Sequence, residues 1–307
     1  MHLSRQQVHF GWDNSLTPVT VVGPGTTVTL DLVEASGGQL NATSSASDLD
    51  NLDFGLLNPV TGPLFIDGAE PGDTLSITID ELDVSGWGWS ANLPGFGLLS
   101  DQFPDAFLAP STLADGAARL SFGAGVPIVP MIGTIGVALP DPGLHSVVPP
   151  RRFGGNLDIR HITRGSTLLL PVGVSGALLS VGDTHAAMGD GEVCGTGIET
   201  DAVVSLRVEV LKDREITFPR YVTHESSART GAALATTGIG PDLMTATRDA
   251  ASAMIDEIVR RTGIAPVEAY ILASVAADLK ISEVVDAPNW VISMHLPLAI
   301  IEDSPSA

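Results

Sequence analysis

The chain has 307 residues, of which 36 are acidic and 15 are basic, so its formal net charge is −21. This charge argues against nucleic acids and anionic lipid surfaces as partners, because both are polyanions. Hydrophobic residues make up 44% of the chain and charged residues 17%, a balance that excludes wholesale disorder and predicts a globular protein with a sizeable core.

The first two thirds of the chain is predicted to be mainly β structure. Residues 26–33 and 74–80 alternate apolar and polar side chains, which is the two-residue period of a half-buried strand. Proline-glycine turns precede both runs, and strands separated in this way favour a sandwich or a barrel. Residues 83–107 are rich in Gly, Trp and Pro and show no sustained period, which predicts a long surface loop. Such loops are often lids or binding loops. The alternative is a loop that packs on the protein surface without a functional role.

The pattern becomes helical after Thr236. Apolar residues recur at helical spacing over 245–262, and Gly263 stands where that helix would end. A second helix is predicted over 266–280, because a proline begins it and an apolar stripe follows. The stripe consists of Val267, Ile271, Leu272, Val275 and Leu279.

Residues 290–301 return to strand character. We therefore expect a β-rich domain over residues 1–235 and a smaller α+β portion over residues 236–307 packed on it. The start of the chain lacks the apolar core of a secretory signal, and no apolar run reaches the ~18 residues of a membrane span. The expected location is the cytoplasm, with no membrane partner.

The densest polar stretch follows an apolar run that should be a core strand. Asp183, His185, Asp190, Glu192 and Glu199 lie within 17 residues of one another. Side chains two positions apart on an extended strand point to the same side, so the first two residues should share a face, as should the third and fourth. Glycines between the two pairs would allow a hairpin, which could bring oxygen and nitrogen ligands to one divalent cation. The alternative is a Gly-Asp turn with solvated carboxylates.

The chain contains one cysteine, Cys194, which excludes an internal disulfide and a cysteine-rich zinc site. A nucleophilic cysteine of the nitrilase type works together with a glutamate and a lysine. This role is disfavoured for Cys194, because the two lysines of the chain are poorly placed for it: Lys212 lies in a charged turn and Lys280 lies late in a predicted helix. We expect a buried packing role instead. His224 could begin a zinc-protease helix motif, but Ala228 stands where the second histidine is required.

The string GDTHAAMGDGEVCGTGIE over residues 182–199 resembles the signature of the acetamidase/formamidase family. Five further stretches resemble family blocks in the expected order: EASGGQ (34–39), NPVTGP (58–63), DGAEPGD (67–73), GGNLD (154–158) and AADLKIS (276–282). The resemblance thus covers nearly the whole chain. Met188 departs from it, because the family commonly has glutamine there.

The resemblance implies hydrolysis of a short linear amide, such as formamide or acetamide, to a carboxylate and ammonia. It also implies a jelly-roll-like β sandwich with a C-terminal α+β addition, a divalent metal such as zinc or calcium, and a homo-oligomer, either a dimer or a larger assembly. A divalent ion can polarise an amide carbonyl and lower the pKa of water that it binds toward about 7.

Within this family context we expect Asp183 and His185 to bind the metal, with Asp158 or Glu192 completing the ligand set. Glycines 154 and 155 precede Asp158 and would let its short side chain enter a crowded site. The general base is expected to be Glu199 or Glu192, either of which could carry a proton from water to the leaving nitrogen.

The expected substrate contacts are Glu34, Gln39 and Asp190. Glu34 and Gln39 flank glycines that permit close approach to a ligand. Two alternatives to amide hydrolysis stay open. One is a metal-stabilised β sandwich that binds a small polar ligand without turnover. The other is a hydrolase of a different C–N bond, such as that of an imine or a ureido compound, which Met188 keeps open.

Overall fold

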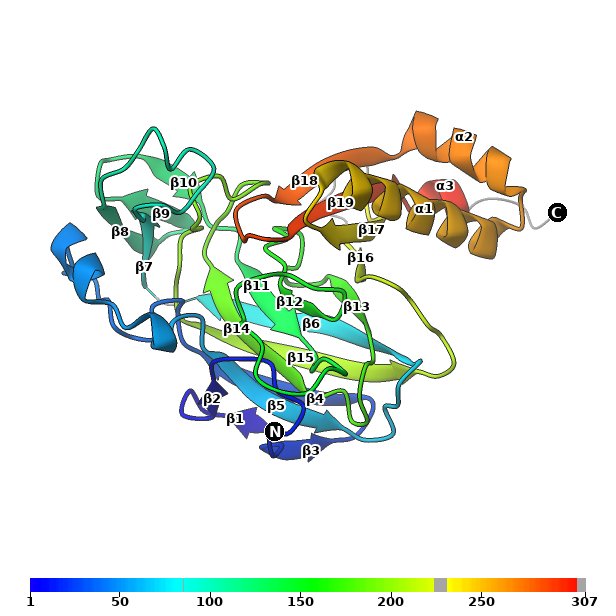
Figure 1. Ribbon diagram of the computed structural model, residues 1–307, viewed down its shortest axis with the longest axis horizontal. Coiled ribbons are helices and arrows are strands. Elements are labelled where there is room, and N and C mark those ends of the chain that lie inside the picture. Colours follow the sequence, from blue (N-terminus) through cyan, green and yellow to red (C-terminus); the bar gives the residue numbers. More distant parts are fainter. Residues whose placement is uncertain (85, 224–230, 303–307) are drawn as a thin grey trace.

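The computed structural model describes residues 1–84, 86–223 and 231–302 (Figure 1). The largest sheet in these residues has nine strands. In spatial order they are β1 (His2–Leu3), β4 (Thr26–Leu32), β15 (Ala202–Leu211), β6 (Thr74–Val84), β13 (Thr167–Pro171), β16 (Arg220–Val222), β17 (Ala233–Gly240), β19 (Trp290–Pro297) and β18 (Asp278–Glu283).

Two smaller sheets complete the β structure of the described residues. The six-stranded sheet consists of β12 (Gly154–Asn156), β11 (Met131–Gly136), β14 (Leu179–His185), β5 (Val60–Ile66) and β2 (Val8–His9), with β3 (Thr20–Val22) also paired to β5. The four-stranded sheet consists of β10 (Gly125–Pro127), β9 (Ala117–Leu120), β8 (Phe107–Ala114) and β7 (Trp87–Asn92). Two short 3-10 turns, Ala46–Asn51 and Phe54–Leu56, precede β5.

The main core lies between the nine-stranded and six-stranded sheets. Alternate residues of β4, namely Val28, Leu30 and Leu32, are fully buried in it. Leu64 of β5 and Leu179 of β14 belong to the same core. Each such side chain contributes roughly 1.5–3 kcal/mol of hydrophobic stabilisation. The predicted mainly β fold with a smaller C-terminal α+β portion is thus confirmed.

The predicted loop over residues 83–107 is only partly correct. Strand β7 occupies part of it and pairs antiparallel with β8. Trp89 and Ala91 of β7 are buried and pack with Leu108 of β8. Gly88 interrupts the alternation of apolar and polar side chains in β7, so the sequence shows no strand period there. Packing against β8 stabilises this segment as a strand. The remaining loop, residues 93–106, forms part of a cavity wall described below.

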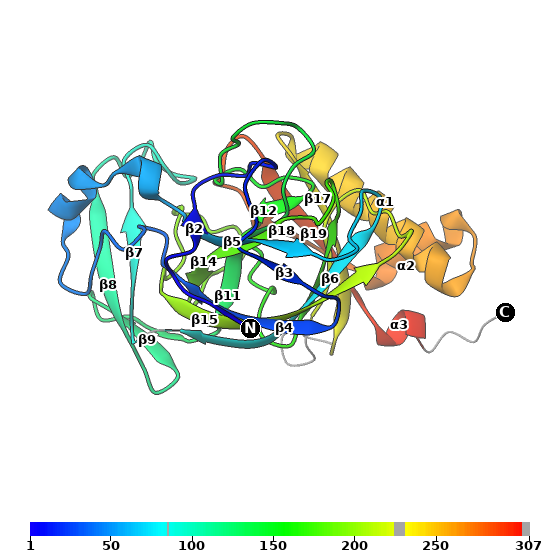
Figure 2. The same ribbon diagram turned by 90° about the horizontal axis from the view of Figure 1, so that it is seen from below.

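The α-helices lie at the opposite end of the molecule from the four-stranded sheet (Figures 1 and 2). Helix α1 (Leu243–Thr262) confirms the first helix prediction, including the end at Gly263, whose φ is 74°. Helix α2 (Pro266–Ala276) is shorter than predicted, because the residues after it pair with β19 as β18. Residues 290–301 form β19 followed by α3 (Ala299–Glu302) rather than a single strand.

Most of the apolar stripe that the sequence places on the second helix is exposed. Val267, Ile271 and Val275 are each at least 60% exposed. The side chains of α2 that enter the core are Ala269 and Ala273. Small side chains allow α2 to pack closely, so the larger apolar residues face outward.

The predicted domain boundary at residues 235/236 falls within β17, which pairs with β16 on one side and β19 on the other. None of the helices in the described residues is both long and apolar enough to cross a membrane.

One buried carboxylate, Glu257 of α1, contacts four arginines. Its oxygens accept hydrogen bonds from Arg261 Nε at 3.1 Å and Arg214 Nη2 at 3.5 Å, and they also contact Arg220 and Arg260. Burial opposes ionisation of Glu257, but the hydrogen bonds from Arg260 and Arg261 outweigh it and lower the pKa to about 2. This ion cluster connects α1 to β16 and to the segment before it.

Replacing Glu257 with glutamine should destabilise the protein strongly, because it leaves four partly buried cations without their common counter-ion. Breaking a buried ion pair typically costs about 3–5 kcal/mol. For a chain of this size we expect the Tm to fall by roughly 5–10 °C in a thermal unfolding experiment. The contribution of Glu257 should be present above about pH 4.5 and lost as the pH falls toward 2.

The matched control for this prediction is Asp256→Asn. Asp256 is the neighbouring acid on α1, but it is exposed. Its substitution should therefore change the Tm by no more than about 1 °C. Equal effects of the two substitutions would contradict the role assigned to the Glu257 cluster.

Candidate functional site

Four carboxylates converge on one ring nitrogen of His185. The His185 Nε2 atom lies 3.1 Å from Glu199 Oε2, 3.3 Å from Asp183 Oδ1, 3.9 Å from Asp158 Oδ1 and 4.0 Å from Glu192 Oε1. All five side chains are buried. The five residues that the sequence singled out as ligands or general bases therefore lie together, although they span 42 positions of the chain.

Three sheet contacts position these side chains. Asp183 and His185 are at the end of β14, between β11 and β5. Asp158 follows β12, which pairs with β11. Glu199 forms isolated bridges to His185 and to Trp89 of β7. Adjacent strands thus bring side chains from distant parts of the sequence to one edge.

Three of the clustered residues adopt left-handed backbone conformations that side chains other than glycine rarely occupy. The φ angles are 43° for Asp158, 47° for Asp183 and 45° for Glu192. Such conformations cost of order 1–3 kcal/mol each and are concentrated at functional sites. The fold therefore holds these carboxylates in place against a local conformational preference.

Glycine on β11 leaves room for two of the carboxylates. A Cβ atom at Gly133 would lie 2.5 Å from Asp158 Oδ1 and 2.6 Å from Asp183 Oδ2. A Cβ at Gly197 would lie 2.7 Å from the His185 ring. Both distances are far below a normal contact, so any larger residue at either position would displace the cluster.

The site carries an excess of negative charge. Burial raises the pKa values of Asp158 and Glu192 well above their ordinary values, and neighbouring carboxylates raise them further. Burial also raises the pKa of Glu199 to about 8. Burial disfavours the charged form of His185, but Glu199 and Asp183 outweigh it and raise the His185 pKa well above its usual value. Either protons or a cation must compensate this charge.

Several oxygen and nitrogen atoms of the cluster that could bind a metal form no hydrogen bond with the described residues. They are both carboxylate oxygens of Asp158, Oε2 of Glu199 and Nδ1 of His185. Two triads, Asp158–His185–Glu192 and Asp183–His185–Glu199, each offer ligand atoms within 4.8 Å of one another. Buried, unpartnered oxygens around an imidazole are what a divalent cation requires, so these residues fit such an ion.

Without a bound cation, the folded protein should lose stability as the pH rises. The raised pKa values of Asp158, Glu192 and Glu199 mean that the folded state binds more protons than the unfolded state between about pH 4.5 and pH 8. Asp183 acts in the opposite direction, because its pKa is lowered: burial opposes ionisation, but His185 outweighs it. We expect the Tm in EDTA to fall by several degrees from about pH 5.5 to pH 8.

The control is the same titration with saturating zinc or calcium. A cation binds the ionised carboxylates and competes with protons, so it should flatten or reverse the decline in Tm. Superimposable Tm profiles with and without the cation would contradict this electrostatic account of the site.

The prediction that Asp190 and Glu192 share a face is wrong. Glu192 points into the cluster, whereas the Asp190 side chain is 34% exposed and lies 4.0 Å from His161 Nε2. Gly191 has a φ of 94°, so this segment is not an extended strand and the two-residue rule fails. Gly191 instead donates its N–H to Ser282 O at 2.8 Å, which ties the segment to β18.

Glu34 and Gln39 organise a loop next to the cavity that contains the cluster, and neither lines that cavity. Glu34 is buried and accepts hydrogen bonds from Ser36 N and from Trp89 Nε1, both at 2.7 Å. Gln39 exchanges hydrogen bonds with the backbone of Asp53. Trp89 does line the cavity, so Glu34 holds one of its wall residues in place.

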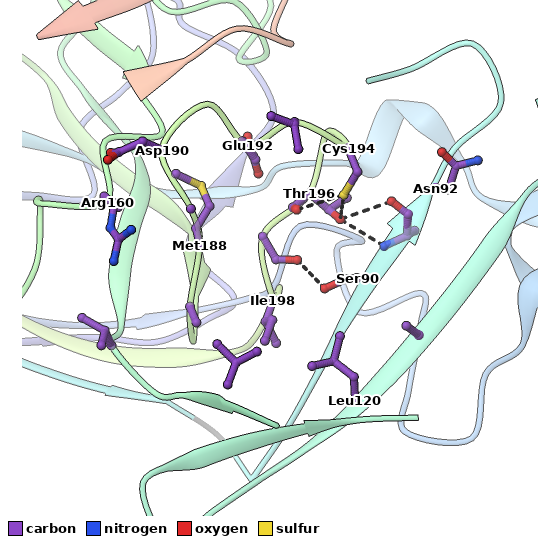
Figure 3. A pocket seen from close by; sticks show the side chains of 18 of the residues that line it. Ser90, Asn92, Leu120, Arg160, Met188, Asp190, Glu192, Cys194, Thr196 and Ile198 are labelled. Atoms are coloured by element: carbon purple, nitrogen blue, oxygen red, sulfur yellow. Dashed lines mark hydrogen bonds between the residues drawn. The ribbon is translucent and has the colours of Figure 1, made fainter. Parts of the chain in front are cut away.

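Met188, Asp190 and Cys194 line a second cavity of 680 Å³ instead (Figure 3). The predicted buried packing role of Cys194 is wrong, because the side chain is exposed. Its sulfur contacts Thr196 and none of the clustered acids.

The segment 224–230, which contains the partial zinc-protease motif at His224, lies outside the described residues.

The sequence did not reveal two further acids, Glu283, which ends β18, and Asp286, which follows that strand. Asp286 lines the cavity, and its Oδ2 accepts a hydrogen bond from Asn156 Nδ2 at 2.7 Å. Glu283 Oε1 accepts from the backbone N–H of Asp286 at 2.5 Å. Burial raises the pKa of Asp286 well above its usual value, and Glu192 raises it further. The one available signal was that both acids directly follow the AADLKIS block.

The cluster lies in a cavity of 480 Å³. Its acidic residues are Asp50, Asp158, Asp183, Glu192, Glu199 and Asp286. Much of its remaining lining is apolar and comes from residues 49–57 and from the loop at 93–106. The loop that the sequence associated with a lid or a binding role therefore contributes to the wall.

Comparison with known proteins shows that the chain is similar to proteins named acetamidase and formamidase. The family model described as "Acetamidase/Formamidase family" matches residues 1–146 and 141–303. The acetamidase of Mycolicibacterium smegmatis is 29% identical over 270 residues, a match that covers 66% of each protein. The formamidase of Methylophilus methylotrophus is 28% identical over 265 residues, which is 67% of this chain and 65% of that protein. The chain therefore spans just under two thirds of the length of these curated relatives.

The crystal structure of an acetamidase from Bacillus halodurans has the same fold. Its TM-score is 0.91 at 32% identity, and the match covers 99% of both chains. The family model also accounts for nearly every residue of the sequence. The resemblance detected in the sequence is thus confirmed, and the chain belongs to the acetamidase/formamidase family.

Proposed function

We propose that the chain is a metal-dependent amidohydrolase that splits a small linear amide into a carboxylate and ammonia. One observation supports this most strongly: four buried carboxylates surround His185 Nε2 at 3.1–4.0 Å in a cavity large enough for a ligand. The family relatives named acetamidase and formamidase support the choice of an amide as substrate.

The proposed metal ligands are Asp183, His185 and Asp158, with Glu192 next to them. A mixed imidazole and carboxylate set suits zinc, whereas the number of carboxylate oxygens also suits calcium. When bound, such an ion supplies a Lewis acid that polarises a carbonyl and acidifies water. Gly133 supports the assignment, because its missing side chain leaves space beside two of the ligands.

Glu199 is the proposed proton carrier, and Glu192 is the second candidate. Glu199 Oε1 accepts a hydrogen bond from Gly197 N at 2.8 Å, which fixes the carboxyl group. Its other oxygen faces His185 Nε2 at 3.1 Å and has no other hydrogen-bond partner among the described residues, so it can take a proton. A pKa raised by burial to about 8 makes both protonation states accessible near neutral pH, as a proton carrier requires.

In the proposed reaction, water adds to the amide carbonyl carbon and loses a proton to Glu199. The carboxyl group then delivers this proton to the amide nitrogen. The C–N bond breaks and releases ammonia and a carboxylic acid, and the acid then gives its proton to ammonia or to water and becomes a carboxylate. The buried position of Glu199 keeps bulk water away from this proton transfer.

The test is ammonia release from formamide, acetamide and propionamide by metal-replete protein. We expect turnover that falls at least about 100-fold after chelation and returns when the metal is restored. Full activity after complete metal removal would overturn the metal dependence. Binding of an amide with no ammonia release would instead favour a ligand-binding protein.

We also propose that the chain forms a homo-oligomer. The exposed apolar residues Val267, Ile271 and Val275 of α2 support this, as does their position next to β18, the edge strand of the nine-stranded sheet. Light scattering of the purified protein should give a multiple of the 31.7 kDa chain mass. Ile271→Glu should lower that mass to one chain. The cytoplasmic location expected from the sequence stays a prediction.

A further inference from the structure

The cavity that contains the acidic cluster is divided into a charged part and an apolar part. The charged residues are the clustered acids around His185, Asp286 and, on the segment that also supplies Leu52 and Phe54, Asp50. The apolar part is formed by Leu52, Phe54, Leu57, Leu93, Phe96 and Val148. A ligand whose reactive group contacts the acids therefore places the rest of its structure against apolar side chains.

The apolar part is too large for the smallest amides. Formamide and acetamide have three and four non-hydrogen atoms, whereas a cavity of 480 Å³ is within the range of about 300–1,000 Å³ that encloses drug-sized ligands. Phe54 is 71% exposed, although it lines this cavity. An apolar substituent on the substrate would cover that ring and displace water from the walls.

The charges of the cavity also restrict the substrate. The described residues that line it include six acids and neither lysine nor arginine. An anionic group on the substrate would meet negative charge without a compensating cation in the apolar part. A neutral substituent would not be repelled by these acids.

We propose that the preferred substrate, among the linear amides that the chain can split, is an uncharged primary amide with a bulky apolar acyl group, such as a straight chain of about six carbons or an aromatic ring. This inference rests on the proposed function. The amide group contacts the acidic cluster, and the acyl group packs against Leu52, Phe54, Leu57 and Phe96. Water adds to the carbonyl carbon, the C–N bond breaks, and the nitrogen leaves with the transferred proton as ammonia.

The inference predicts how kcat/KM depends on the acyl chain. Each buried methylene should raise kcat/KM about three- to fourfold until the apolar part is filled. We therefore expect hexanamide to exceed acetamide by at least about 30-fold. The monoamide of adipic acid has the same chain with a terminal carboxylate, and it should be at least about 10-fold poorer than hexanamide.

Two phenylalanines provide matched variants. Phe54 lines the cavity, whereas Phe103 is similarly exposed, at 58%, on the neighbouring loop and does not line it. Phe54→Ala should lower the ratio of the hexanamide and acetamide kcat/KM values at least about fivefold. Phe103→Ala should leave this ratio unchanged. Calorimetric titration of Glu199→Gln with both amides should show the same preference for hexanamide in Kd, independently of turnover.

The outcomes separate this inference from the function on which it rests. Ammonia release with a kcat/KM that is flat or falls with chain length would overturn the acyl-group inference and leave the amidase proposal standing. An equal ratio change in Phe54→Ala and Phe103→Ala would also overturn it. No ammonia from any amide in metal-replete protein would overturn the amidase proposal, and the substrate assignment with it.

Discussion

His185→Ala should abolish both turnover and metal binding. The Nε2 atom of His185 is the point on which four carboxylates converge, and it belongs to both of the candidate ligand triads. Without the ring, the carboxylates lose the nitrogen ligand on which they converge, and in the metal-free protein an imidazolium no longer relieves their mutual repulsion. We expect kcat/KM to fall about 10³-fold or more, with metal content close to background by elemental analysis.

The control is His2→Ala. His2 is an exposed histidine on the edge strand β1, and its ring contacts Asp31 of the neighbouring strand β4. It should retain full metal content and activity. A folded His185→Ala protein that kept its metal would show that the cation binds elsewhere. Circular dichroism and thermal unfolding of both variants establish that each is folded.

Glu199→Gln should separate proton transfer from metal binding. The amide oxygen of glutamine can still accept the hydrogen bond from Gly197 N, so the geometry of the segment is preserved. The substituted side chain cannot carry a proton, and the loss of general base catalysis typically costs about 10²–10⁴-fold in kcat. We expect this loss with metal content unchanged.

Glu192→Gln is the matched comparison, since Glu192 is the second candidate for the same role. Both glutamates belong to candidate ligand triads. If Glu199 is the proton carrier and Glu192 lies beside the metal ligands, Glu192→Gln should weaken metal binding more than Glu199→Gln does. Undiminished kcat in Glu199→Gln would remove that residue from the proton-transfer role and assign it to Glu192.

Local patterns in the sequence predicted those parts of the fold whose stability depends on a single repeating face. The alternation of β4 and the helical spacing of α1 are of this kind, and both elements are present. Strand β7 was missed, because Gly88 interrupts the period and pairing with β8 decides the conformation of the strand. The end of α2 was misplaced for a similar reason, since pairing with β19 makes the following residues a strand.

The candidate site was predictable where its residues lie close together in the sequence. Asp183 and His185 share one strand, and Glu199 bridges to the same strand. Asp286 is more than 100 residues from Asp183 and His185 and reaches the cluster through β18, so only its position shortly after the AADLKIS block marks it. The wrong expectation for Asp190 has a local cause, because Gly191 and Glu192 adopt left-handed conformations that reverse the direction of the side chains.

The central claim is that the buried acids around His185 bind a divalent cation, and elemental analysis of protein purified without chelator tests it most directly. The account predicts at least one zinc or calcium ion per chain, and its loss in His185→Ala. The contradictory result is a folded, wild-type protein that holds no divalent cation at neutral pH and takes up none when zinc or calcium is added.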